Sequence, residues 1–268
     1  MSERIALIDS DSILYSAFYG NKVVDDVTGE PKKEDGKFVI VPKTDEQIME
    51  TLDGIFHHIF TEGKFTHYII FVKGNNTTVD RLEANPEYKQ HRTKEIPEKW
   101  EFTKQYAIEK WGAIEVNDIE VDDAIRICSR NMPNSYIVAI DKDLLWLSGE
   151  NFNWRKNEWT YITPAMEEMY FCRSMIVGDT VDNIKGIPGK GEKYCIKNNI
   201  DSICQVLNEY INEYGASKGV NEFYKNFKAL YILEESDKFT QLPTPIKIEY
   251  DNGENRESRS TAGNLSNT

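Results

Sequence analysis

Eight acidic residues of this chain follow predicted strands or begin predicted helices. Carboxylates gathered in one place raise one another's pKa, and divalent cations relieve the repulsion between them. Because the candidate ligands are all oxygen atoms, Mg²⁺ or Mn²⁺ suits them better than zinc. Two such ions, about 4 Å apart, can hold the attacking and leaving oxygens of a phosphodiester and generate hydroxide from bound water. The candidate metal ligands are Asp9, Glu120, Asp122, Asp123, Asp141, Asp143, Asp179 and Asp182.

Residues 178–191, GDTVDNIKGIPGKG, combine two of these acids with glycines. If the segment is helical, Asp179 and Asp182 share a face and can converge on one cation. Glycines permit positive φ and a close approach of the backbone to a ligand, and amides at the start of a following helix suit a phosphate. An ordinary acidic surface loop has the same composition, and the upstream acids favour the functional interpretation. The glycines concerned are Gly186, Gly189 and Gly191.

Alternating strand and helix patterns must position the acids. Apolar runs predict strands at 4–8, 67–72, 113–116 and 136–140. Helical periodicity covers 44–61 and 100–111, and a further helix opens at Glu120, where a single acid could be no more than a cap. Open α/β sheets bind ligands beyond the carboxyl ends of their strands, so acids that follow parallel strands are expected at one edge of an α/β sheet.

Residues 75–99 form a polar stretch of mixed charge. In it, Tyr88 stands beside Lys89 and close to Arg92. An aromatic ring next to phosphate-seeking cations suits a single strand or a flap. The stretch also holds four glutamates, so by itself it is equally typical of a charged surface loop.

Composition excludes several classes of protein. The net charge of −13 over 268 residues argues against nucleic-acid binding by general positive charge, so any basic surface must be local. The four cysteines lack the CxxC spacing of zinc or redox sites, and no GxSxG or GxxxxGK[ST] motif indicates acyl transfer or ATP binding. The start lacks a signal-peptide core and no apolar run of ~18 residues occurs, so a cytoplasmic protein without membrane contact is expected.

Five segments occur in the order found in the 5′-nuclease superfamily: DSDS, NPEYKQHR, EVDDAIRI, AIDKDLLWL and GDTVDNIKGIPGKG. The chain resembles this superfamily of flap endonucleases, polymerase I 5′-nuclease domains and phage 5′-to-3′ exonucleases over roughly residues 4–200, and its size is most similar to that of the phage enzymes. The resemblance implies a PIN-like α/β domain over 1–177, with a mostly parallel sheet flanked by helices and an arch or clamp at 75–99. It also implies a helix-hairpin-helix lobe over 178–250. The polar stretch 251–268 is expected to be disordered.

The resemblance assigns roles to single residues. One metal ion would bind Asp9, Glu120 and Asp122, and the other would bind Asp141, Asp143 and Asp179, with Asp122 able to bridge and with Asp123 and Asp182 nearby. Lys89 and Arg92 match the catalytic basic residues that contact the scissile phosphate. The expected DNA-binding residues are these two and Tyr88, Gly186, Gly189, Lys190, Gly191 and Lys193, and the hairpin carbonyls would hold K⁺.

The implied function is that of a metal-dependent 5′-to-3′ exonuclease and structure-specific flap endonuclease in phage-type DNA replication. It would act as a monomer on DNA with 5′ ends, flaps or RNA primers, with a single-strand-binding protein or a polymerase as a partner. A DxD-type phosphatase acting on small esters is a weaker hypothesis, because it leaves the glycine hairpin unexplained.

Lys73 departs from the family pattern. The family carries an aspartate after the second strand, where this chain has Val72, Lys73 and Gly74. A cation there replaces an expected ligand of the first metal ion, so the alternative function is a branched-DNA-binding protein with weakened or lost nuclease activity. Replacing Lys73 by aspartate should raise the rate at low Mg²⁺, unless another carboxylate already fills that place.

Overall fold

The computed structural model describes residues 3–25, 28–92 and 96–250, and its centre is a mostly parallel β-sheet. Strand β1 (Ile5–Asp9) lies between β6 (His67–Lys73) and β8 (Ser135–Ala139), and both neighbours run parallel to it. The strands follow one another across the sheet in the order β10 (Glu158–Ile162), β9 (Gly149–Asn153), β8, β1, β6 and β13 (Ile246–Lys247), and β7 (Ile114–Val116) also pairs with β6. The expected α/β class with a mostly parallel sheet is confirmed.

The two margins of the sheet are built differently. Strand β9 (Gly149–Asn153) continues the parallel order beside β8, and β10 (Glu158–Ile162) folds back on it as a hairpin. At the other margin, β7 (Ile114–Val116) runs parallel to the end of β6, while β13 (Ile246–Lys247) runs antiparallel to its start. One margin of β6 is therefore shared by two short strands.

Helices cover both faces of the sheet because the central strands are apolar on both faces. In β1, Ala6 and Ile8 join the core beneath one layer of helices, whereas Ile5 and Leu7 join the core beneath the other. The first layer consists of α1 (Asp11–Phe18), α2 (Asp45–Gly63) and α4 (Trp100–Trp111). The second consists of α5 (Val121–Asn131) and α6 (Lys142–Leu145).

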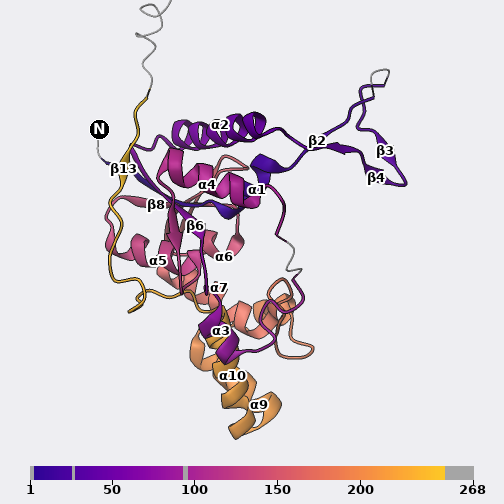
Figure 1. Cartoon of the computed structure of the whole chain (residues 1–268). Helices are drawn as coiled ribbons and strands as arrows, with labels where there is room; N and C mark the ends of the chain where they lie inside the picture. The colour runs from indigo at the N-terminus through magenta and orange to yellow at the C-terminus, as the bar shows by residue number, and fades with distance from the viewer. Residues whose placement is uncertain (1–2, 26–27, 93–95, 251–268) are drawn as a thin grey trace, which may run out of the picture.

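A helical lobe with its own apolar core follows the sheet. It comprises α7 (Pro164–Val177), α8 (Glu192–Lys197), α9 (Ile203–Tyr214) and α10 (Ala216–Leu230), and it extends away from the sheet in Figure 1. Between α7 and α8 lies a two-stranded ribbon of β11 (Gly178–Asp179) and β12 (Ile184–Lys185). Asp179 and Asp182 therefore lie on a strand and a turn, and the prediction that they share a helical face is wrong.

The glycines of the ribbon differ in what they do. Gly189 has a φ of 73°, and a Cβ added there would meet no atom within 4 Å. Gly186 lacks a positive φ, but a Cβ on it would lie 2.2 Å from the carbonyl oxygen of Ile176, so only glycine allows this close packing. Gly191 also lacks a positive φ and is the N-cap of α8. Of the three predicted positions, one has the left-handed backbone.

The segment that follows α10 packs against the sheet. After α10 the chain returns to the sheet, where β13 pairs with β6 and the Tyr250 hydroxyl donates to the Phe65 carbonyl oxygen at 2.5 Å. The segment 231–250 thus belongs with the sheet rather than with the lobe. The sequence patterns also missed β13 and the short helix α3 (Val79–Ala84), which packs against α10. The prediction of a disordered stretch at 251–268 lies outside the described residues.

Two further short two-stranded ribbons lie outside the central sheet. A small hairpin is formed by β3 (Lys33–Glu34) and β4 (Lys37–Phe38), next to a second ribbon of β2 (Asn21–Lys22) and β5 (Ile40–Val41) (Figure 1). Within the described residues, no helix has the length and apolar character needed to cross a membrane.

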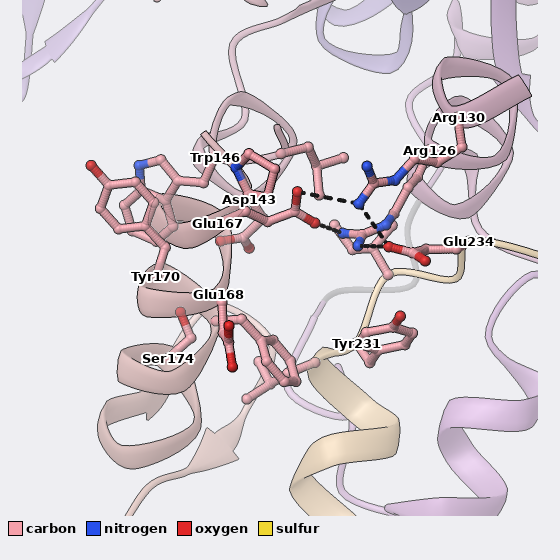
Figure 2. A pocket seen from close by; sticks show the side chains of 15 residues that line it. Arg126, Arg130, Asp143, Trp146, Glu167, Glu168, Tyr170, Ser174, Tyr231 and Glu234 are labelled. Carbon is pink, nitrogen blue, oxygen red and sulfur yellow. Dashed lines mark hydrogen bonds and ion pairs between the residues drawn. The ribbon is translucent and has the colours of Figure 1, made fainter. Parts of the chain in front are cut away.

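A buried ion-pair network joins three parts of the chain. Arg126 on α5 pairs with Glu167 on α7 and with Glu234 in the returning segment, and Arg130 lies 2.8 Å from the Glu234 carboxylate (Figure 2). The side chains of Arg126 and Glu167 are 9% and 11% exposed, whereas that of Arg130 is 41% exposed. The network lines a cavity of about 260 Å³, whose wall includes the stacked rings of Trp146 and Tyr170.

Removing Arg126 tests how much this network stabilises the fold. Breaking a buried pair leaves an uncompensated charge and costs about 3–5 kcal/mol, so Arg126→Leu should lower the free energy of unfolding by about 3 kcal/mol in a urea titration. Arg130→Leu is the matched control, because loss of a half-exposed pair costs about 1 kcal/mol or less. Equal losses for the two variants would contradict a stabilising role for the buried pair.

Candidate metal and nucleic-acid site

A cavity of about 620 Å³ lies at the carboxyl ends of β1, β6 and β8. The parallel order of these strands brings residues that are distant in the sequence to the same edge of the sheet. Seven of the eight predicted acids line the cavity: Asp9, Glu120, Asp122, Asp141, Asp143, Asp179 and Asp182. The cations Lys73, Lys89 and Arg92 also line it. Asp123 does not.

Local backbone geometry fixes the orientation of several of these acids. Asp9 ends β1, and its Oδ1 accepts a bond from the amide of Asp11 at 3.3 Å. Asp141 is the N-cap of α6 and accepts from the amide of Asp143 at 2.9 Å. Asp179 accepts from the amides of Val181 at 2.7 Å and Asp182 at 3.1 Å, which closes the turn after β11. Each carboxylate is therefore held by the turn that follows its strand.

The acids in the cavity repel one another. The pKa of Asp9 is raised well above its usual value by burial and then by the charges of Asp11, Asp122 and Asp141. Burial and the charge of Asp141 raise the pKa of Asp122 to about 7, and the same two causes raise the pKa of Asp143 to about 6. At neutral pH the site thus carries negative charge that the protein offsets only in part.

The donor set fits hard divalent cations, although it is not a closed cage. Among the described residues, no three His, Cys, Asp or Glu side chains form a group compact enough to hold an ion as they stand. The acids that line the cavity offer oxygen atoms alone, the donors that Mg²⁺ and Mn²⁺ prefer. Because Asp9 is 9% exposed and surrounded by like charges, a bound cation would remove an electrostatic penalty that the fold leaves in place.

Asp123 has a structural role and does not reach the cavity. Its Oδ1 accepts from Arg81 at 2.8 Å and from the Leu233 amide at 2.8 Å, while its Oδ2 accepts from the Glu120 amide at 3.2 Å. As the third residue of α5, it completes a capping box with Glu120. Both of its oxygens are bonded within the fold, and its place among the metal ligands stays a prediction.

Glu120 is surrounded by residues of the 75–99 segment. It forms an ion pair with Arg81 and accepts from the Tyr88 hydroxyl at 2.9 Å and from Lys89 Nζ at 2.6 Å. Tyr88 is 2% exposed, so its ring is not presented to solvent as a base-stacking surface would have to be. The predicted ligand and the predicted phosphate contacts thus bind one another in this structure.

Asp182 contacts both of the predicted phosphate-binding cations, Lys89 and Arg92. Its carboxylate pairs with Arg92 and lies 3.7 Å from Lys89 Nζ, and its carbonyl oxygen accepts from the Lys89 amide at 2.9 Å. Arg92 is about half exposed, whereas the Lys89 side chain is 21% exposed. Both cations therefore face the cavity and are held there by carboxylates.

The hairpin residues lie apart from the cavity. Lys190 pairs with Glu209 at 2.7 Å and lies 3.8 Å from Glu213, so its charge is already offset. Lys193 is exposed, and the positive φ of Gly189 leaves that part of the backbone open. None of the predicted hairpin residues lines the cavity that holds the acids.

Sequence reasoning missed three residues that line the cavity. Lys142 lies 3.2 Å from the Asp179 carboxylate, Asp11 begins α1, and Tyr15 on α1 is 48% exposed. The signal for Asp11 is its place two residues after Asp9, in the segment DSDS. Tyr15 lies one helical turn further along α1, so helical spacing from Asp11 could have found it.

Comparisons with known proteins bear on both sequence and fold. No family model matches the sequence. The chain is 27% identical over 276 residues to DNA polymerase I of Bacillus subtilis, covering 92% of this chain and 29% of that protein. It is 25% identical over 209 residues to a 5′-3′ exonuclease of Buchnera aphidicola, covering 70% and 67% respectively. The chain thus spans less than a third of the polymerase relative.

Solved structures with a similar fold include two from bacteriophage T5. A flap endonuclease complex with DNA and metal ions aligns with a TM-score of 0.58 and 16% identity, over 85% of this chain and 89% of that one. A 5′-exonuclease mutant aligns with a TM-score of 0.53 and 15% identity, over 87% and 88%. These likenesses confirm the fold expected from the sequence.

Replacing Asp122 tests the electrostatic reading of the cavity. Because folding raises the pKa of Asp122 to about 7, its ionisation costs the metal-free protein stability as the pH rises from about 4, where the unfolded carboxyl ionises, to about 7. At pH 8 without divalent metal, Asp122→Asn should therefore raise Tm by about 2–4 °C, equivalent to ~1 kcal/mol. A calorimetric scan checks this, with the exposed Asp201→Asn as control. A lower Tm for Asp122→Asn would contradict the prediction.

Proposed function

We propose that this chain, which has the fold and the ordered motifs of the 5′-nuclease superfamily, is a metal-dependent 5′-to-3′ exonuclease and structure-specific flap endonuclease. The observation that carries the proposal is one cavity at the carboxyl ends of parallel strands in which eight carboxylates, Asp11 among them, meet four cations. Oxygen ligands for divalent ions beside phosphate-binding cations are what phosphodiester hydrolysis requires. The relative from Buchnera aphidicola is itself named a 5′-3′ exonuclease.

Two Mg²⁺ or Mn²⁺ ions are the proposed cofactors. Asp9 and Asp122 would hold one ion, and Asp141, Asp143 and Asp179 would hold the other, all of them lining the cavity. When bound, the ions supply an activated water and stabilise the leaving oxygen, so no protein nucleophile is needed. Glu120 would join the first ion only after giving up its bonds to Arg81, Tyr88 and Lys89.

Lys89 and Arg92 are the proposed phosphate contacts. Their present carboxylate partners, Glu120 and Asp182, hold both cations at the cavity wall. Bound metal ions would neutralise part of the negative charge of these carboxylates. A scissile phosphate could then replace the carboxylates as the partner of Lys89 and Arg92. Tyr15, half exposed on the same wall, offers a ring on which the adjacent base could stack.

The wider setting of the proposal follows the resemblance. The substrates would be DNA with 5′ ends, flaps or RNA primers in phage-type replication, with the chain acting as a monomer beside a polymerase or a single-strand-binding protein. The lobe that follows the sheet would grip the duplex through the open backbone near Gly189 and through the exposed Lys193, with K⁺ held by hairpin carbonyls.

Cleavage of a 5′-flap duplex tests the function directly. The intact protein with Mg²⁺ or Mn²⁺ should release short products with 5′-phosphates, and EDTA or Asp141→Ala should abolish release. The Asp201→Asn variant should cut normally, because Asp201 lies outside the cavity. Tight binding of the flap without cutting would favour the branched-DNA-binding alternative. Hydrolysis of a small phosphate ester without DNA binding or cleavage would favour a phosphatase.

Lys89→Ala separates catalysis from binding. If Lys89 stabilises charge that develops on the phosphate, its loss should lower kcat on the flap substrate by about 10²-fold, as for other groups that stabilise developing charge. Affinity for the same DNA in Ca²⁺ should fall much less, because Arg92 and the lobe remain. Single-turnover cleavage and a filter-binding titration measure the two effects. An equal loss in both would assign Lys89 to ground-state binding.

A further inference from the structure

The end of β6 receives a carboxylate from β1 rather than from its own sequence. Strands β1 and β6 are parallel, with Asp9 in register with Phe71. Two residues beyond this pair in the sequence, Oδ1 of Asp11 accepts a hydrogen bond from the backbone amide of Lys73 at 3.3 Å. The Asp11 carboxylate thus lies at the backbone position from which an aspartate at residue 73 would extend.

Asp11 faces the same cavity as the proposed metal ligands. It lines the cavity with Asp9, Asp122 and Asp141, and its charge contributes to raising the pKa of Asp9. Its Oδ2 has no hydrogen-bond partner among the described residues. Burial raises the pKa of the Asp11 carboxyl, and the hydrogen bond from the Lys73 amide and the charges of nearby lysines oppose that rise in part. One oxygen of a fixed carboxylate is therefore free to bind a cation.

Lys73 is placed differently from Asp11. Its side chain is exposed on the cavity wall, and among the described residues no carboxylate lies within ion-pair distance of its Nζ. Lys89, Arg92 and Lys142 on the same wall all have such a partner. Among the described residues Lys73 thus forms no close ion pair, and its charge acts on the Asp11 carboxyl from a longer distance.

We propose that Asp11 supplies the metal-binding carboxylate that the family takes from the end of the second strand, and that Lys73 uses its freed position to bind a DNA phosphate. The inference rests on the proposed function and adds two residues to it. The site loses no carboxylate by having a lysine at 73, since one is gained at 11. The lysine adds a cation on the side from which a polyanion enters.

Binding of Mn²⁺ in the absence of DNA tests the role of Asp11 without reference to cleavage. Titration of the full chain with Mn²⁺, followed by electron paramagnetic resonance, should show about a tenfold or greater loss of affinity for Asp11→Asn. Asp9→Asn is the positive control and Asp201→Asn the neutral one, with circular dichroism to check folding. Lys73→Asp should improve Mn²⁺ affinity by less than threefold, because the position is already served.

The outcomes of this titration distinguish the inference from the function. Loss of affinity in Asp9→Asn but not in Asp11→Asn would overturn the role of Asp11 and leave the proposed nuclease intact. A tenfold or greater gain for Lys73→Asp would also overturn it, because it would mean that the ligand at the end of β6 is missing. If no variant alters Mn²⁺ binding, the metal site of the proposed function fails as well.

The salt dependence of DNA binding tests the role of Lys73. With Ca²⁺ and a 5′-flap duplex, Lys73→Ala should reduce the slope of log K against log[KCl] by about 0.9, the value for one phosphate contact, while Lys73→Arg should keep it. Lys64→Ala is the matched control, because this exposed lysine precedes β6 at the opposite edge of the sheet. An unchanged slope for Lys73→Ala would overturn the phosphate contact.

Discussion

Crowding of like charges at one edge of a parallel sheet is the constraint on which this structure depends. Strand direction alone brings the acids together, and burial then raises the pKa of Asp9, Asp122 and Asp143. The fold answers with cations from other parts of the chain. Arg81, Lys89, Arg92 and Lys142 each approach a carboxylate in or beside the cavity. The charge that these cations leave uncompensated is what a divalent ion would offset.

The same pairing ties distant segments to the sheet. Arg81 on α3 contacts Asp123 and the carbonyl oxygen of Tyr231, and Asp123 also accepts from the Leu233 amide. The segment that carries the basic residues and the segment that returns from the lobe are thus anchored to the first turn of α5. In the proposed function, metal or phosphate would compete with the pairs of Lys89 with Glu120 and of Arg92 with Asp182, so binding would be coupled to the arrangement of Lys89 and Arg92.

Lys73 is informative because it departs from the pattern of the superfamily that the chain resembles, at a point where the Asp11 carboxylate bonds to the backbone amide. A carboxylate at the edge of a sheet can come from either of two parallel neighbours, since their ends lie side by side. Asp11 reaches the end of β6 from the end of β1. The number of carboxylates at a site can therefore be kept while their positions in the sequence change.

The sequence by itself determined the sheet, most of its helices and the gathering of the acids, because apolar periodicity and strand-end position are local signals. It could not assign each acid a task. Glu120 holds Arg81, Tyr88 and Lys89 through contacts made across more than 30 residues, and Arg81 lies on a helix that the pattern missed. Asp123 caps α5 locally, but its bonds to Arg81 and to the Leu233 amide also join distant segments. Tertiary structure also decided the return of β13 to the sheet, because two residues carry too little periodicity to predict a strand. Only the folded chain sets the strands in register and brings their neighbours together. The tertiary structure therefore decides which strand end supplies a carboxylate and which cation lacks a close ion-pair partner.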